Sequence, residues 1–95
     1  MATMFNPPHP GLLVKECMEA LGISARTLAR ELGVSPSTVQ RLITAKSDVS
    51  PEMAPRLSVV IGSSERVWMG MQNDYDLWQA KQNIDLTKLH RLVVA

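Results

Sequence analysis

Residues 24–43 of the chain read SARTLARELGVSPSTVQRLI. A serine stands just before each of the two apolar segments in this stretch, and serine is a favoured cap for the first turn of a helix. Pro36 follows the second serine, at the position where proline best begins a helix. Gly33 can adopt the left-handed conformation that ends a helix. The stretch therefore predicts a helix over residues 25–32, a tight turn, and a second helix over residues 36–44.

The spacing of small and apolar residues fits two short helices that cross at a steep angle. Such a pair needs a very small residue at the crossing and a residue that tolerates positive φ in the turn, and Ala29 and Gly33 supply them four residues apart. The apolar candidates for the shared core are Leu28, Leu32, Val34, Val39 and Leu42. These features indicate a helix-turn-helix motif over residues 24–44. An ordinary corner between two helices of a bundle is the alternative.

The outward face of the second helix carries side chains that form hydrogen bonds, and none of them is acidic. They are Ser37, Thr38, Gln40, Arg41 and Thr44. A helix that reads DNA needs donors and acceptors for the base edges and no carboxylate that faces the phosphates. We expect Arg41 to donate two hydrogen bonds to a guanine edge, and Gln40 or Ser37 to read an adenine. The pattern predicts a DNA-recognition helix.

Basic residues flank this face. Arg26 lies near the start of the first helix and Lys46 just beyond the second, where the sugar-phosphate backbone would pass. Between Ser24 and Lys46 four basic residues stand against one acidic residue, a charge of +3, whereas residues 47–95 carry five bases and six acids. The amides at the start of the first helix also favour a phosphate, and Ser35 completes the predicted DNA-binding set. Taken singly, each charge fits a solvated surface equally well.

The composition indicates one small domain over residues 1–95, with an arm at 1–10 and a tail at 83–95. Hydrophobic residues make up 45% of the chain, which is enough for a core. The single cysteine excludes an intramolecular disulfide and a multi-cysteine zinc site. No apolar run is long enough to span a bilayer, and the arm lacks the pattern of a signal peptide. A cytoplasmic protein is expected.

Three further helices are predicted around the motif, which gives an all-α domain of five helices. The first covers residues 12–21, where apolar residues with a period of four are expected to form the inner face. They are Leu13, Cys17 and Leu21, with Val14 and Met18 beside them. The next helix covers residues 51–61 with a cap at Ser50, and Pro55 in its second turn is expected to cause a kink or a ragged start. The last helix covers residues 65–82.

The C-terminal part of the chain is the predicted dimer contact. The apolar stripe Val67, Trp68 and Met71 on the last helix is expected to pack on the core. A helix-turn-helix domain contacts only about four base pairs, so two copies are needed for useful specificity. The predicted dimerisation residues are Leu77, Trp78, Leu86, Leu89 and Leu92. The tail could form a short helix capped by Asp85, which we favour, or an extended segment.

No residues suggest an enzyme, a metal site or a cofactor site. Asp74 and Asp76 are two residues apart on a predicted helix, so their carboxylates point in different directions and cannot act as a pair. His9 and His90 lack the spacing of metal ligands. Cys17 lies on a predicted inner face, where a structural thiol is expected. The chain also lacks a glycine-rich phosphate-binding loop.

The segments that flank the motif resemble those of the HigA family of antitoxins, within the larger class of Cro-like and phage-repressor-like regulators. They are His9-Pro10-Gly11, Leu21-Gly22-Ile23-Ser24, and Val67-Trp68-Met69 with Gln72 and Tyr75-Asp76-Leu77. The resemblance covers about residues 8–80 and implies a five-helix domain similar to that of the lambda repressor. One departure is the loop Thr44-Ala45-Lys46, which usually reads Asn-Gly-Lys and bears on a backbone contact to DNA.

The resemblance further implies a homodimer that binds a palindromic operator in its own promoter and neutralises a toxin similar to the mRNA-cleaving RelE ribonucleases. The toxin could bind the tail or the N-terminal arm. Two alternatives from the residues themselves are a stand-alone or phage-type repressor without a toxin and a protein-interaction module whose DNA binding is vestigial.

Overall fold

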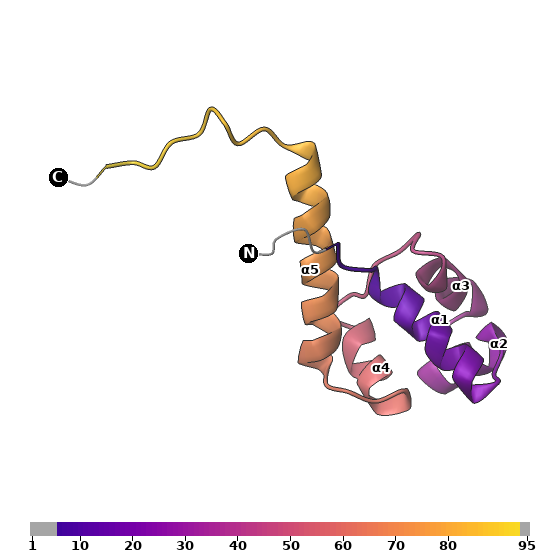
Figure 1. Ribbon diagram of the computed structural model, residues 1–95. Coiled ribbons are helices and arrows are strands. Elements are labelled where there is room, and N and C mark those ends of the chain that lie inside the picture. Colours follow the sequence, from indigo (N-terminus) through magenta and orange to yellow (C-terminus); the bar gives the residue numbers. More distant parts are fainter. Residues whose placement is uncertain (1–5, 94–95) are drawn as a thin grey trace.

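The protein is built from five helices (Figure 1). The computed structural model describes residues 6–93, so residues 1–5 of the predicted arm and residues 94–95 of the predicted tail lie outside the described residues. The helices are α1 (Pro10–Leu21), α2 (Ala25–Leu32), α3 (Pro36–Ile43), α4 (Met53–Val60) and α5 (Glu65–Asn83). Residues 6–93 contain no strand, and the all-α prediction is confirmed. None of these helices combines the length and apolar character needed to cross a membrane.

Helices α2 and α3 form the predicted helix-turn-helix pair. The hydroxyl of Ser24 accepts a hydrogen bond from the amide of Thr27, and Ser35 caps α3 in the same way through Thr38. Gly33 ends α2 in the left-handed conformation, with a φ of 74°. Ala29 is buried at the crossing. The capping residues and the turn therefore lie where the sequence placed them.

Helix α1 differs from its prediction in both start and inner face. His9 caps the helix and Pro10 is its first residue, so it begins two residues earlier than predicted. The predicted inner face is wrong for Leu13 and Leu21, which are exposed, and for Cys17, which is only half-buried. It is confirmed for Val14 and Met18, which are buried. Helix α1 packs on α3 and α5 with the side that carries Gly11, because this glycine permits close packing. Periodicity alone does not identify this side.

Helix α4 starts later than predicted. Ser50 accepts a hydrogen bond from the amide of Met53 through its hydroxyl and one from Ala54 through its carbonyl, and residues 51–52 form a turn before the helix. Pro55 therefore lies in the first turn of α4, where backbone amides have no helical partner in any case. The prediction that Pro55 lies in the second turn is wrong, because the helix starts two residues later than the sequence predicted.

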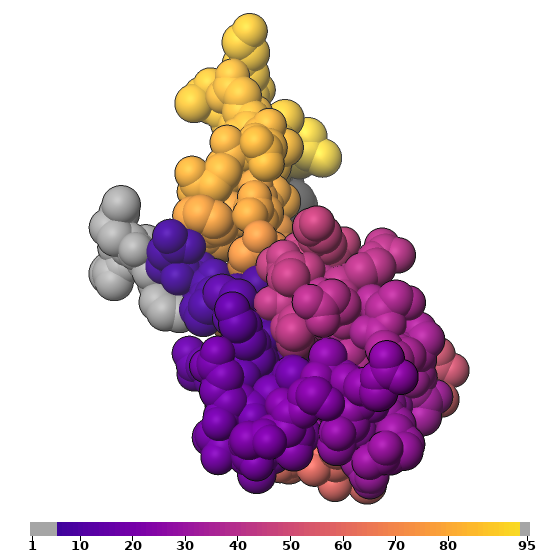
Figure 2. All heavy atoms as spheres, turned by 90° about the vertical axis from the view of Figure 1, so that its right-hand side faces the viewer, coloured from indigo at the N-terminus to yellow at the C-terminus, as the bar shows by residue number. Residues whose placement is uncertain are grey.

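Helix α5 is the longest element, and its second half projects beyond the other helices (Figure 1 and Figure 2). Trp68 is buried, and its indole N–H donates to the carbonyl of Gly62 at 2.9 Å. Met71 packs against the core, but Val67 is 48% exposed, which corrects the prediction that it belongs to the core.

The tail after Asn83 is not helical. Ile84 has extended backbone angles, and residues 84–93 are exposed along their whole length. Asp85 accepts hydrogen bonds from the hydroxyl and the amide of Thr87 at 2.6 and 3.0 Å, and these bonds lower the pKa of the Asp85 carboxyl. The favoured short helix is thus a wrong prediction. The leucines of the tail are exposed, so no packed face supports a helix of such a length.

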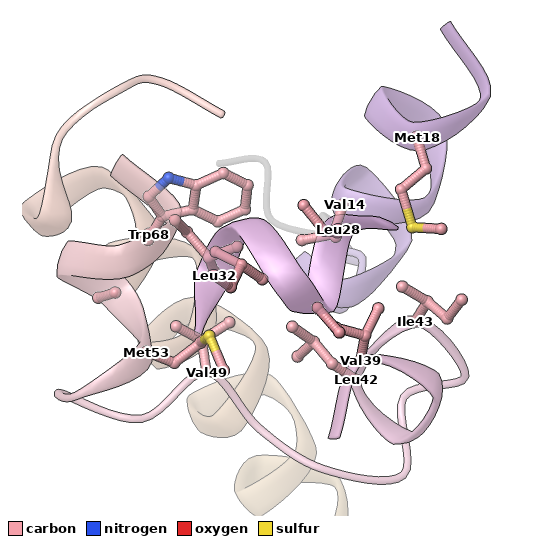
Figure 3. Packing of buried hydrophobic residues seen from close by; sticks show 13 residues of the cluster. Val14, Met18, Leu28, Leu32, Val39, Leu42, Ile43, Val49, Met53 and Trp68 are labelled. Carbon is pink, nitrogen blue, oxygen red and sulfur yellow. The ribbon is translucent and has the colours of Figure 1, made fainter. Parts of the chain in front are cut away.

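The core lies where all five helices meet (Figure 3). Trp68 from α5, Leu57 from α4, Leu28 from α2 and Val14 from α1 are almost completely buried in it, and Val49 joins them from the loop after α3. The remaining buried aliphatic members include Leu32, Val39, Leu42, Ile43 and Met53. The inner side of α3 is therefore held mainly by α1 and α2, while α4 and α5 complete the core around them.

Candidate nucleic-acid interface

The outward face of α3 is free of the protein's own core. Val39, Leu42 and Ile43 are buried on the inner side of the helix. Ser37, Gln40 and Arg41 are exposed on the other side, and Thr38 is half-buried. Glu and Asp are absent from α3, so this surface can approach phosphates without a like charge.

Several hydroxyl groups in this surface are engaged in local hydrogen bonds. The Ser35 hydroxyl lies 3.1 Å from that of Ser37 and 2.9 Å from that of Thr38. The hydroxyl of Thr44 donates to the backbone carbonyl of Gln40 at 2.8 Å. These bonds stabilise the two ends of α3 and orient the hydroxyls. Within residues 6–93, the side chains of Gln40 and Arg41 form no hydrogen bond or ion pair. Their donors are therefore available for a ligand.

The basic side chains surround the same surface. Arg26 on α2, Arg41 on α3 and Lys46 after α3 are exposed, and none of them forms an ion pair within residues 6–93. Arg30, by contrast, lies 3.9 Å from the carboxylate of Glu31. Arg26, Arg41 and Lys46 therefore leave positive charge uncompensated on and beside the predicted recognition helix, as contact with a phosphate backbone requires.

The loop after α3 turns through a left-handed residue. Ala45 has a φ of 59°, and the amides of Lys46 and Ser47 both donate to the carbonyl of Arg41, at 2.8 and 3.2 Å. This is the conformation that glycine adopts most easily, and an alanine there costs about 1 kcal/mol. Ala45 thus takes the left-handed turn for which the glycine of the family's Asn-Gly-Lys sequence is suited, and the Lys46 side chain is exposed.

Two buried polar residues hold the loop after α3, and neither was among the predicted site residues. Gln72 of α5 accepts a hydrogen bond from the amide of Val49 at 2.7 Å and donates to Asp76 at 2.9 Å. His9 is also buried; its Nδ1 accepts from the amide of Gly11, and its Nε2 lies 3.3 Å from Asp48. The signal in the sequence was that both residues belong to the flanking segments shared with the HigA family.

The predicted dimerisation residues lie at the far end of α5 and along the tail. Leu77, Leu86, Leu89 and Leu92 are exposed, and Trp78 is half-buried. Among residues 6–93, no three histidine, cysteine or carboxylate side chains lie close enough to hold a metal ion.

Comparisons with known proteins agree with this geometry. A family model described as helix-turn-helix matches residues 14–68. The chain is 44% identical over 90 residues to the uncharacterized HTH-type transcriptional regulator YddM of Escherichia coli, which covers 95% of this chain and 96% of the relative. It is 31% identical over 80 residues to antitoxin HigA-1 of Vibrio cholerae, which covers 83% and 75%.

A solved structure shares the same architecture. The antitoxin GraA in complex with its operator superposes with a TM-score of 0.86 at 33% identity and covers 99% of both chains. Transcriptional regulators and antitoxins are not enzymes, and the prediction of a non-enzymatic protein is confirmed by these relatives. The predicted resemblance to HigA antitoxins is confirmed as well.

Proposed function

The chain belongs to the helix-turn-helix family of DNA-binding regulators, which includes HigA antitoxins, and from this we propose that it represses its own promoter by binding an operator through α3. The observation that carries the proposal is the outward face of α3. This face is polar, free of acidic residues and surrounded by unpaired basic side chains. A structural neighbour with the same arrangement of helices has been solved with its operator.

Each side chain of the site has a proposed part in this binding. Arg41, with Gln40 and Ser37, faces the base edges, because these side chains project from the exposed side of α3. Arg26 and Lys46 contact the phosphates on either side. At the starts of α2 and α3, the backbone amides that do not donate to Ser24 or Ser35 remain free to bind phosphate. Thr38, Thr44 and Ser35 act mainly by fixing the ends of α3.

Arg41→Ala tests the recognition helix. We expect the variant to bind the native promoter more weakly by about 1–3 kcal/mol and to lose its preference at one base pair, because a bidentate contact is removed. Gel shifts with the promoter and with single-base variants measure both effects. Arg66→Ala, which removes an exposed basic residue on α5, is the matched control and should bind like the parent. Unchanged affinity of Arg41→Ala would contradict the assignment.

The salt dependence separates this function from a protein-interaction module with vestigial DNA binding. Genuine phosphate contacts release counterions, so the logarithm of affinity should fall steeply with the logarithm of salt concentration. Lys46→Ala should reduce this slope by about one phosphate contact while lowering affinity for all sequences to a similar degree. A flat salt dependence of the parent protein would favour the interaction module.

We further propose that the protein acts as a homodimer on a palindromic operator and neutralises an mRNA-cleaving toxin similar to RelE. Support for the dimer comes from the exposed apolar residues at the end of α5 and in the tail. Support for the toxin comes from relatives named as antitoxins. Expression of the adjacent reading frame alone and together with this chain tests the second part: growth arrest that co-expression relieves is expected. A neighbour without toxicity would favour a stand-alone or phage-type repressor.

A further inference from the structure

An apolar groove lies between the N-terminal segment, α1 and α5. Its volume is about 300 Å³. Pro7 and Leu13 line one side and Met71 of α5 lines the other, while Glu16 and Asp74 place two carboxylates at it. We call it the arm groove. Leu13 in the first turn of α1 remains 38% exposed there.

The C-terminal tail has the complementary chemistry. Its leucines recur every third residue at Leu86, Leu89 and Leu92, and all three are exposed. Lys88 and Arg91 stand between them and form no ion pair within the described residues. The acidic residue of the tail, Asp85, already accepts two hydrogen bonds from the neighbouring threonine. The tail therefore presents leucines and positive charge, and the arm groove presents apolar walls and negative charge.

The position of the arm groove favours a second copy of the chain as the source of the tail. The tail leaves α5 with extended backbone at Ile84 and leads away from its own domain (Figure 1). Asp74 lies nine residues before the end of α5, about 14 Å back along the helix. Met71, Asp74 and Trp78 are spaced by three and four residues, so the groove and the proposed dimer contact share one face of α5.

We propose that in the homodimer the tail of each copy, residues 84–93, docks in the arm groove of the other, with its leucines against Leu13 and Met71 and with Lys88 and Arg91 near Glu16 and Asp74. This inference rests on the proposed homodimer and specifies its contact. A two-fold axis uses both tails and both grooves, so each contact occurs twice. The arrangement buries the apolar residues that a single copy leaves exposed.

Charge exchange between two variants tests the proposal. The groove variant carries E16K and D74K, and the tail variant carries K88E and R91E. Each alone should dimerise about tenfold more weakly than the parent at low ionic strength, because attraction becomes repulsion at two sites per groove. An equimolar mixture should recover dimerisation, because each tail then meets a groove of opposite charge. Sedimentation equilibrium of the full chain measures both results.

Controls make each outcome decisive. E19K with E65K reverses two exposed acids outside the groove and should leave dimerisation unchanged, and circular dichroism verifies that all variants are folded. If a chain with all four changes dimerised normally and the mixture did not, the tail would bind the groove of its own copy. That result would overturn the proposal. Variants that dimerise like the parent would also overturn it; if they then lost toxin binding, the groove would be assigned to the toxin.

The operator assay separates this inference from the proposed function. Normal dimerisation of both variants together with intact operator binding by the parent would reject the docked tail and leave the repressor function standing. Absence of operator binding by the parent would reject the repressor function itself, whatever the tail does.

Discussion

Replacement of Trp68 by alanine is expected to lower the free energy of unfolding by about 4 kcal/mol. Trp68 is 1% exposed, is the largest fully buried side chain of the described core, and contributes from α5 to the cluster that also holds Leu57 and Leu28. Its removal leaves a cavity that the surrounding helices cannot fill. Since small domains are stable by only about 5–15 kcal/mol, this change removes a large fraction of the total. Urea unfolding followed by circular dichroism measures it.

Trp68→Phe separates packing from hydrogen bonding at the same position. The phenyl ring retains most of the apolar volume but lacks the indole N–H that donates to the carbonyl of Gly62. We expect a loss of about 1–2 kcal/mol, because the part-buried carbonyl of Gly62 loses its hydrogen-bond donor. If Trp68→Ala and Trp68→Phe were equally destabilising, the cavity explanation would be wrong.

Gly11→Ala is the second change with a large expected effect. A β-carbon at position 11 would overlap the backbone carbonyl oxygen of Leu42, which cannot move without displacing the end of α3. It would also lie 3.0 Å from Nδ1 of His9, the atom that accepts the Gly11 amide hydrogen bond. We expect a loss of about 3 kcal/mol in the free energy of unfolding. Weaker operator binding should accompany it, because α3 is displaced.

Gly70→Ala is the matched control for this effect. Gly70 lies within α5, and a β-carbon there would meet no atom within 4 Å. The same substitution should therefore stabilise the protein by about 1 kcal/mol, because alanine is the better helix former. Opposite signs for the two substitutions would be difficult to explain by general helix propensity. A Gly11→Ala protein as stable as the parent would show that the contact between α1 and α3 is not tight.

Local signals predicted most of the fold. The caps Ser24 and Ser35, the left-handed Gly33 and the small Ala29 at the crossing each act over a few residues, and the structure contains all of them. The buried side of α1 was not predictable in the same way. It depends on which apolar edge meets α3 and α5, and the close approach is permitted by a glycine outside the periodic pattern.

The conformation of the tail and the contacts of His9 and Gln72 could not be predicted from local sequence signals either. A segment with leucines at every third residue forms a helix only where another element covers them, and residues 84–93 have no such cover within one copy. The contacts of His9 with Asp48 and of Gln72 with Val49 join residues far apart in the sequence. Such pairings follow from tertiary packing. The surface residues of α3, in contrast, were predictable because its apolar side chains fall on one side of the helix and its polar side chains on the other.

The hydrogen bond from the Val49 amide to Gln72 has a mechanical consequence. It attaches the segment after α3 to the middle of α5, and so connects the surface proposed to bind DNA with the helix that carries part of the proposed dimer contact. If the protein binds its operator as a dimer, the angle between the two copies then sets whether both α3 helices can enter successive turns of the double helix. A partner that changed this angle would release the promoter without touching the side chains of α3.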